Sequence, residues 1–379
     1  EDFMDSEGAC TMRTASNQQS CEPDAVYPDA VLNIARDSAS VFQLKRKWEK
    51  TPPMLNLTPD FQRRLVWKPK QKSELIESIL MGIPLPLIYV KEDEKGVYVI
   101  VDGKQRLSTL FSFINNEFAL EKLTILKDKN GFRFDKLTPL EQNKIEDCSL
   151  TLHVIKAPTS DRVTFDLFGR VNRGGTRLNN QEMRNALYQG NSTELINRLA
   201  EKKAFVEATE HSIPANHMKD RYLVLRFVAF YLWQQHVTID PDTDGPLDYR
   251  SNVEDFLGKM MRFLNRLEPE NGLFKELDTR FTRAMELAIR LLPSGGFRLP
   301  SSPGKKRPIN MAFFESFSYL LSRLNGEGEQ LHCQIQEVYM QLICDAAYLD
   351  SLTRSVDSGK QTEKRYEIID RLIYELKLC

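Results

Sequence analysis

The stretch that most constrains how this chain folds is VYVIVDGKQRLSTL, residues 97–110. Its first five residues, Val97–Val101, are β-branched or aromatic, which predicts a buried strand. Asp102-Gly103 breaks that strand. From Lys104 onward the apolar residues recur at helical spacing. They are Leu107, Leu110, Phe111 and Ile114. The sequence therefore predicts a buried strand that passes directly into a helix through a glycine.

This strand-to-helix corner is suited to binding phosphate. At a helix start the backbone N–H groups point outward and the dipole is positive, and Gly103 allows close approach. Lys104 and Arg106 add positive charge, while Asp102 is suited to holding Mg²⁺ or orienting a water. An ordinary turn is the alternative, with Asp102 as the N-cap and both bases on a solvated face. Spacing alone leaves both interpretations open.

A basic stretch lies upstream, between Phe61 and Lys72, and contains no acid. Its bases are Arg63, Arg64, Lys68, Lys70 and Lys72. Charge runs usually mark a solvated face. Here Trp67 and the apolar pair Leu65-Val66 favour partial burial, and hence a local anion-binding surface.

Two further loops carry basic residues. The first follows a helix predicted over 161–171 and contains Arg170, Asn172, Arg173, Gly174, Gly175 and Arg177. Its bases are either end caps at the negative end of the helix dipole or the second wall of an anion site. The second loop, 293–308, is rich in Gly, Ser and Pro. Its candidate DNA-contacting bases are Arg298, Lys305, Lys306 and Arg307. A merely solvated loop is the alternative.

The chain has 379 residues, enough for two or three domains. We predict a disordered acidic tail over 1–30, an α+β domain over 31–190 and an all-α helical domain over 191–379. In the α+β domain the predicted strands are 87–90, 97–101 and 150–155, with small β elements around 118–134. The predicted helices are 36–49, 71–81, 105–116, one from Thr138, 161–171 and one after Asn179.

The sequence predicts helix almost throughout the second half of the chain. The predicted helices are 193–203, 219–236, 251–267, 275–292, 309–324, 329–348 and 361–377. We expect the stripe Leu223, Val224, Phe227 and Tyr231 to be core. Cys333 and Cys344, eleven residues apart on one predicted helix, are expected in the core too.

Composition excludes several classes of protein. A net charge of −1 gives no global basic field for nucleic acid, and no apolar run approaches the ~20 residues of a membrane span. Six cysteines without a CxxC pair indicate reduced thiols, so we expect a cytoplasmic protein. There is no P-loop, no G-x-S-x-G elbow, no dinucleotide fingerprint and no histidine cluster for zinc.

Four stretches follow one another in the order and spacing of a known family. They are Phe61-Gln62-Arg63 with Trp67, Asp102–Leu107, Phe168–Gly175, and Leu178–Glu182 with Arg184-Asn185. Over about 40–320 the chain resembles the N-terminal domain family of the GmrSD type IV restriction enzymes. That family has a ParB/sulfiredoxin-like core with the hallmark D-G-Q-Q-R. This chain has Lys104 where the family usually has Gln.

The resemblance implies a small mixed sheet with helices, followed by a helical domain. It also implies that the chain binds and hydrolyses a nucleoside triphosphate with Mg²⁺, as the sensing component of an anti-phage or restriction-type defence system. The implied catalytic residues are Asp102, also the metal ligand, with Gln105 and Arg106. The implied nucleotide-binding residues are Gln62, Arg63, Gly103, Lys104, Asn172 and Arg173.

Two other functions remain open on the sequence. One is a non-catalytic ParB-like module that uses the same bases to contact DNA backbone phosphates. The other is a protein-interaction scaffold in which the corner is structural. The expected partners are a nucleotide, DNA in the second case, and an effector protein or a second copy of the chain, without a membrane. Nuclease activity by this chain alone is not expected. The sequence does not identify the nucleotide or the oligomeric state.

Overall fold

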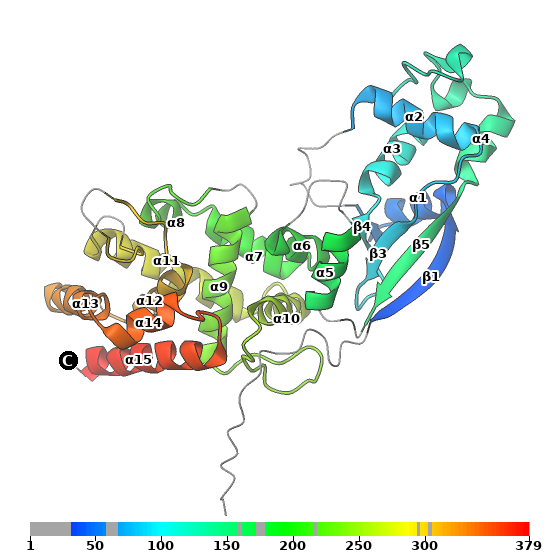
Figure 1. Cartoon of the computed structure of the whole chain (residues 1–379). Coiled ribbons are helices and arrows are strands. Elements are labelled where there is room, and N and C mark those ends of the chain that lie inside the picture. The colour runs from blue at the N-terminus through cyan, green and yellow to red at the C-terminus, as the bar shows by residue number, and fades with distance from the viewer. Residues whose placement is uncertain are drawn as a thin grey trace, which may run out of the picture.

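The computed structural model contains a mixed sheet with helices in its N-terminal part and a bundle of helices in the rest (Figure 1). The residues it describes are 32–57, 67–157, 159, 161–171, 179–214, 218–293, 296–301, 305–326 and 328–378. The predicted α+β fold is therefore confirmed. The predicted tail, 1–30, lies outside the described residues.

The sheet has five strands in the order β1-β5-β3-β4-β2. Their bounds are β1 Asn33–Ser40, β2 Leu55–Asn56, β3 Ile88–Glu92, β4 Tyr98–Asp102 and β5 Ser149–Lys156. β1 pairs antiparallel with β5, β5 parallel with β3, β3 antiparallel with β4, and β4 parallel with β2. The predicted hairpin of β3 and β4 is confirmed, and β4 lies between β3 and the short edge strand β2.

The two faces of the sheet belong to different hydrophobic clusters. The helices of the N-terminal part are α1 Val41–Glu49, α2 Pro69–Leu80, α3 Lys104–Ile114, α4 Pro139–Glu146, α5 Asp161–Val171 and α6 Asn180–Leu187. Ile100 of β4 packs in one cluster with residues of α1 to α4. Its neighbours Val99 and Val101 point the other way, because side chains alternate along a strand, and pack in a cluster that includes Phe165 of α5.

That second cluster continues through the helical part of the chain. The helices there are α7 Asn191–Ala200, α8 Lys203–Ala208, α9 Lys219–Gln234, α10 Val253–Arg266, α11 Gly272–Leu291, α12 Met311–Arg323, α13 Glu329–Leu342, α14 Ala346–Thr353 and α15 Gly359–Leu378. The predicted core stripe of α9 is confirmed, since Leu223, Val224, Phe227 and Tyr231 are fully buried. The boundary at residue 190 stays a prediction, because α5 and α6 share the cluster of the helical part.

The predicted helix 36–49 begins later than the sequence suggests. Asn33–Ser40 forms β1, and α1 begins at Val41. Ser40 and Gln43 form a capping box that fixes this start, with the Gln43 N–H donating to Ser40 Oγ at 3.2 Å. β5 supplies the partner that β1 needs, from Asn33 opposite Lys156 to Ser40 opposite Ser149.

The segment 118–134 contains no described strand, so the predicted β elements there are wrong. Short 3-10 turns at Lys127–Lys129 and Phe134–Lys136 take their place. Buried side chains of α2 hold this loop. The Glu77 carboxylate accepts from the N–H groups of Ile125 (2.9 Å) and Leu126 (2.8 Å). Side chains thus satisfy backbone groups that a strand would have paired.

The predicted helix 329–348 is two helices, α13 and α14. Asp345 caps the second, because its carboxylate accepts from the Tyr348 N–H at 2.7 Å. Cys344 therefore lies between helices. Both Cys333 and Cys344 are exposed, so the prediction that they are core residues is wrong.

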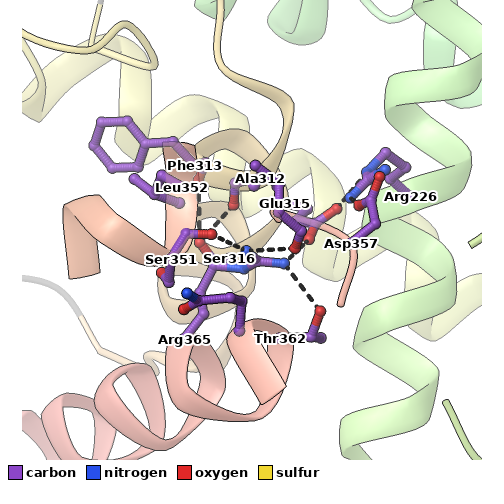
Figure 2. Close-up of polar contacts among 12 residues, drawn as sticks. Arg226, Ala312, Phe313, Glu315, Ser316, Ser351, Leu352, Asp357, Thr362 and Arg365 are labelled. Atoms are coloured by element: carbon purple, nitrogen blue, oxygen red, sulfur yellow. Dashed lines mark hydrogen bonds and ion pairs between the residues drawn. The ribbon is translucent and has the colours of Figure 1, made fainter. Parts of the chain in front are cut away.

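A buried charge network ties α9, α12 and α15 together (Figure 2). Glu315 of α12 is fully buried between two arginines, accepting from Arg226 Nε at 2.5 Å and from Arg365 Nη2 at 3.1 Å. Arg226 Nη2 also pairs with Asp357 at 2.7 Å. Burial raises the pKa of Glu315, and the two arginine charges oppose that shift. The carboxylate thus neutralises buried positive charge from two other helices.

Replacing Glu315 with Ala should lower the free energy of unfolding by about 3–5 kcal/mol, because Arg365 is left buried without a counter-charge and Arg226 keeps only Asp357. Denaturant unfolding followed by circular dichroism measures the change. The exposed Glu286→Ala is the control and should stay within about 0.5 kcal/mol of wild type. Equal stabilities of the two variants would show that the network contributes little.

Candidate strand-to-helix corner

The predicted passage from strand to helix through a glycine is confirmed. β4 ends at Asp102, and α3 begins at Lys104. Gly103 between them has φ +101°, a left-handed conformation that side chains rarely adopt. A Cβ at this position would lie 2.9 Å from Ile88 Cγ1 and 3.2 Å from Ile88 Cγ2. Both the backbone conformation and the packing of β3 therefore require glycine here.

Arg106 anchors this corner to the start of β3. Its Nη2 donates to Asp102 Oδ2 at 2.9 Å and to the Leu87 carbonyl at 3.2 Å, and its Nη1 donates to the Pro86 carbonyl. The arginine side chain is 12% exposed and the Asp102 side chain 33%. Asp102 is therefore not the N-cap, and Arg106 is not on a solvated face.

The pairing has a chemical consequence for Asp102. Arg106 holds one carboxylate oxygen and fixes the orientation of the group. Burial lowers the pKa of the Arg106 guanidinium, while the charge of Asp102 raises it. Because both Nη atoms donate to protein oxygens, Arg106 orients Asp102 in this structure. Its expected catalytic role stays a prediction.

Gln105 links the corner to the chain that precedes α2, since its Oε1 accepts from the Trp67 N–H at 3.4 Å. Lys104 and Gln105 are both half-buried. The remaining expected nucleotide-binding residues lie outside the described residues. They are Gln62, Arg63, Asn172 and Arg173. The prediction that these side chains share one cleft with Asp102 therefore stays a prediction.

The basic loop before α12 divides into inward and outward side chains. Arg298 is 11% exposed, and its Nε lies 3.4 Å from Glu210. Lys306 also pairs with Glu210, at 2.7 Å, although its side chain is 61% exposed. Lys305 and Arg307 are exposed. Contact with DNA stays a prediction, and the exposed bases Lys305, Lys306 and Arg307 are accessible for it.

Helix α6 contains buried polar residues whose contacts were not predicted from the sequence. They are Gln181, Glu182, Arg184 and Asn185. Arg184 donates to Gln181 Oε1 at 3.0 and 3.1 Å and pairs with Glu254 of α10. By periodicity alone such a helix looks solvated. A helix after Asn179 was predicted, and the family resemblance, which included Glu182, Arg184 and Asn185, marked its polar residues.

Among the described residues, no group of three or more His, Cys, Asp or Glu side chains is arranged to hold a metal ion. The described helices also include none with the length and apolar character of a membrane span.

The comparison with protein families matches residues 43–189 to the GmrSD restriction endonuclease, N-terminal domain. The match extends from α1 to just beyond α6 and contains the corner Asp102–Arg106. The family match indicates that the protein is a component of a restriction-type defence system. Residues 43–189 form a domain of the GmrSD N-terminal domain family, as the resemblance predicted. No curated protein and no solved structure matches the chain.

Gly103→Ala should destabilise the protein more than Gly82→Ala. Both glycines have positive φ, which costs about 1–2 kcal/mol for alanine. A Cβ at Gly82 meets no atom within 4 Å, whereas one at Gly103 meets Ile88. Overpacking should add about 1–3 kcal/mol to the Gly103 variant. Denaturant unfolding of both variants measures the difference. Equal decreases in the free energy of unfolding would show that the contact of the added Cβ with Ile88 adds no cost.

Proposed function

We propose that this chain is the nucleotide-binding sensor of a restriction-type defence system and that it hydrolyses a nucleoside triphosphate. One observation carries the proposal. Gly103 is the N-cap of α3 and directly follows a buried strand, between an oriented carboxylate and a lysine, inside a domain of the GmrSD family. Strand–glycine–helix corners are a recurrent way to present a helix N-terminus to phosphate.

In this proposal the phosphates bind at the N-terminus of α3, where the helix dipole is positive. Lys104 adds a point charge there, and the left-handed Gly103 lets the helix begin directly after β4. Gln105 and Asp102 lie beside the reacting phosphate. Gln62, Arg63, Asn172 and Arg173 complete the site from the neighbouring loops. Arg106 keeps Asp102 oriented through its bonds to Asp102 and to the start of β3.

The side chains at the corner are suited to a nucleotide bound with Mg²⁺. Protein sites for Mg²⁺ in phosphoryl chemistry usually supply one or two carboxylates, with nucleotide phosphates and waters as the other ligands. Asp102 is a single, partly exposed carboxylate beside the helix N-terminus, which is enough for such a site. Bound Mg²⁺ would neutralise phosphate charge. Asp102 would hold the ion or orient the attacking water.

Lys104 distinguishes this chain from the D-G-Q-Q-R pattern of the family. An ammonium group favours an anion but cannot accept a hydrogen bond, whereas a glutamine amide can do both. The substitution therefore favours retained phosphate binding with an altered base preference or hydrolysis rate.

A second candidate function is a DNA-binding module without chemistry. Lys305 and Arg307 favour it, because they are exposed on one loop of the helical part. Binding of this kind depends on phosphate contacts and weakens steeply with salt. The near-zero net charge of the chain favours the nucleotide sensor instead.

The wild-type protein should release phosphate from at least one triphosphate in Mg²⁺. Asp102→Asn keeps an oxygen for Arg106 but loses the charge, so turnover should fall on the order of 10²-fold with a smaller change in binding. Arg106→Ala should reduce both, because the corner loses its anchor.

Colorimetric phosphate release and fluorescent-nucleotide binding measure these two quantities. Asp278→Asn is the matched control, because this carboxylate of α11 is likewise paired with basic side chains, Arg198 at 3.1 Å and Lys202 at 2.9 Å. It should behave like wild type. Equal phosphate release from wild type and Asp102→Asn would remove the catalytic role of Asp102.

We also expect that the purified chain makes no double-strand breaks in DNA. Plasmid is incubated with the protein, Mg²⁺ or Mn²⁺ and each triphosphate, with EDTA as the control. Cleavage that survives removal of contaminating nucleases would reveal a nuclease site that we have not identified. Salt-sensitive gel-shift binding without phosphate release would favour the DNA-binding module.

A further inference from the structure

The hairpin of β3 and β4 reaches from the corner to the helical part of the chain. Its strands pair from Tyr89 opposite Asp102 to Glu92 opposite Tyr98. At a rise of about 3.3 Å per residue, β4 separates Asp102 from the turn by roughly 16 Å. The turn is fixed internally, because Asp93 Oδ1 accepts from the N–H groups of Lys95 and Val97, both at 2.8 Å.

Glu94 in that turn is held by two arginines of α10. Its Oε1 accepts from Arg262 Nε at 3.0 Å and Nη2 at 2.5 Å, and its Oε2 accepts from Arg266 Nε at 3.2 Å and Nη2 at 3.1 Å. Burial raises the pKa of Glu94, but the bonds and charges of the two arginines outweigh it and lower the pKa overall. We call Glu94, Arg262 and Arg266 the hairpin latch.

The arginines of the latch are themselves held by the loop before α10. Arg262 Nη1 pairs with Asp242 at 2.8 Å, and Arg266 Nη2 donates to the Pro241 carbonyl at 2.8 Å. Lys259 of the same helix pairs with Asp240 at 2.7 Å. The two arginines therefore connect the hairpin tip both to α10 and to the loop over 239–246.

Helix α10 is well placed to pass such a displacement on. At its N-terminal end Glu254 pairs with the buried Arg184 of α6. The helix also packs against α5, α7 and α9. The latch itself is partly exposed, with side-chain exposures of 46% for Glu94, 21% for Arg262 and 42% for Arg266. Ion pairs in contact with water break more easily than the buried pairs of Glu315.

We propose that the hairpin latch couples ligand occupancy of the corner Asp102–Arg106 to the conformation of α10 and the loop 239–246. The nucleotide-dependent part of this inference rests on the proposed function. The β3–β4 hairpin connects the two, with the corner at one end and the hairpin latch at its turn. Coupling requires an element whose equilibrium both sites bias, and the partly exposed latch is such an element.

Hydrogen–deuterium exchange of the full-length protein tests the coupling. Each of ATP, GTP, CTP and UTP is added with Mg²⁺ to wild type, Glu94→Gln and Asp278→Asn. A nucleotide that binds should change exchange rates in α10 and 239–246 about fivefold or more in wild type. The change should persist in Asp278→Asn and disappear in Glu94→Gln. The same change in Glu94→Gln would overturn the proposal.

A second comparison needs no nucleotide. Arg106→Gln perturbs the corner directly, and Gly103→Ala does so by a different route. Each should speed exchange in α10 and 239–246 when Glu94 is present and should have no further effect in the Glu94→Gln background. Effects confined to the corner would overturn the latch. If no nucleotide alters exchange anywhere, the proposed function fails, while this second comparison still decides the coupling.

Discussion

The left-handed turn at Gly103 is the constraint on which the candidate site depends. It allows β4 to pass into α3 without an intervening loop, and it lets Ile88 of β3 pack where a Cβ would lie. Arg106, one turn into the helix, then reaches back to Asp102 and to the carbonyls of Pro86 and Leu87. Backbone conformation, strand packing and a charge-assisted clamp therefore fix one geometry together, so that the orientation of the carboxylate is set before any ligand arrives.

The structure uses ion pairs in two physically different ways. Glu315 lies fully buried between Arg226 and Arg365. Loss of a partner there leaves a buried charge with neither its ion pair nor water around it, which is costly. The network therefore holds α9, α12 and α15 in one arrangement. Glu94 also lies between two arginines, but all three side chains retain contact with water. Exposed pairs contribute little to stability and cost little to rearrange. The rigid network therefore supports the helical part, and the adjustable one lies where the hairpin meets it.

Local rules predicted the elements that define the corner. Hydrophobic periodicity and the Asp-Gly break located β4 and α3, and the helix starts predicted at Thr138 and after Asn179 coincide with capping boxes of α4 and α6. The failures occurred where distant partners decide. β1 depends on β5, and the loop over 118–134 depends on Glu77 of α2. The contacts of Arg106 were also not predicted, because a helical pattern does not reveal that the side chain reaches the carbonyls of Pro86 and Leu87, just before β3. Gln62, Arg63, Asn172 and Arg173 lie outside the described residues.

The charges around α3 favour an anion at its N-terminus. Its first turn contains no acidic residue, so the positive end of the helix dipole meets Lys104 rather than a carboxylate. The one acid at the corner, Asp102, is paired with Arg106, which leaves the corner without excess negative charge. A lysine at this position opposes the dipole when no anion is present and complements it when one binds. A neutral side chain at this position would avoid this conflict. Lys104 thus makes the corner electrostatically less favourable without an anion, while the carboxylate next to it is held in one orientation.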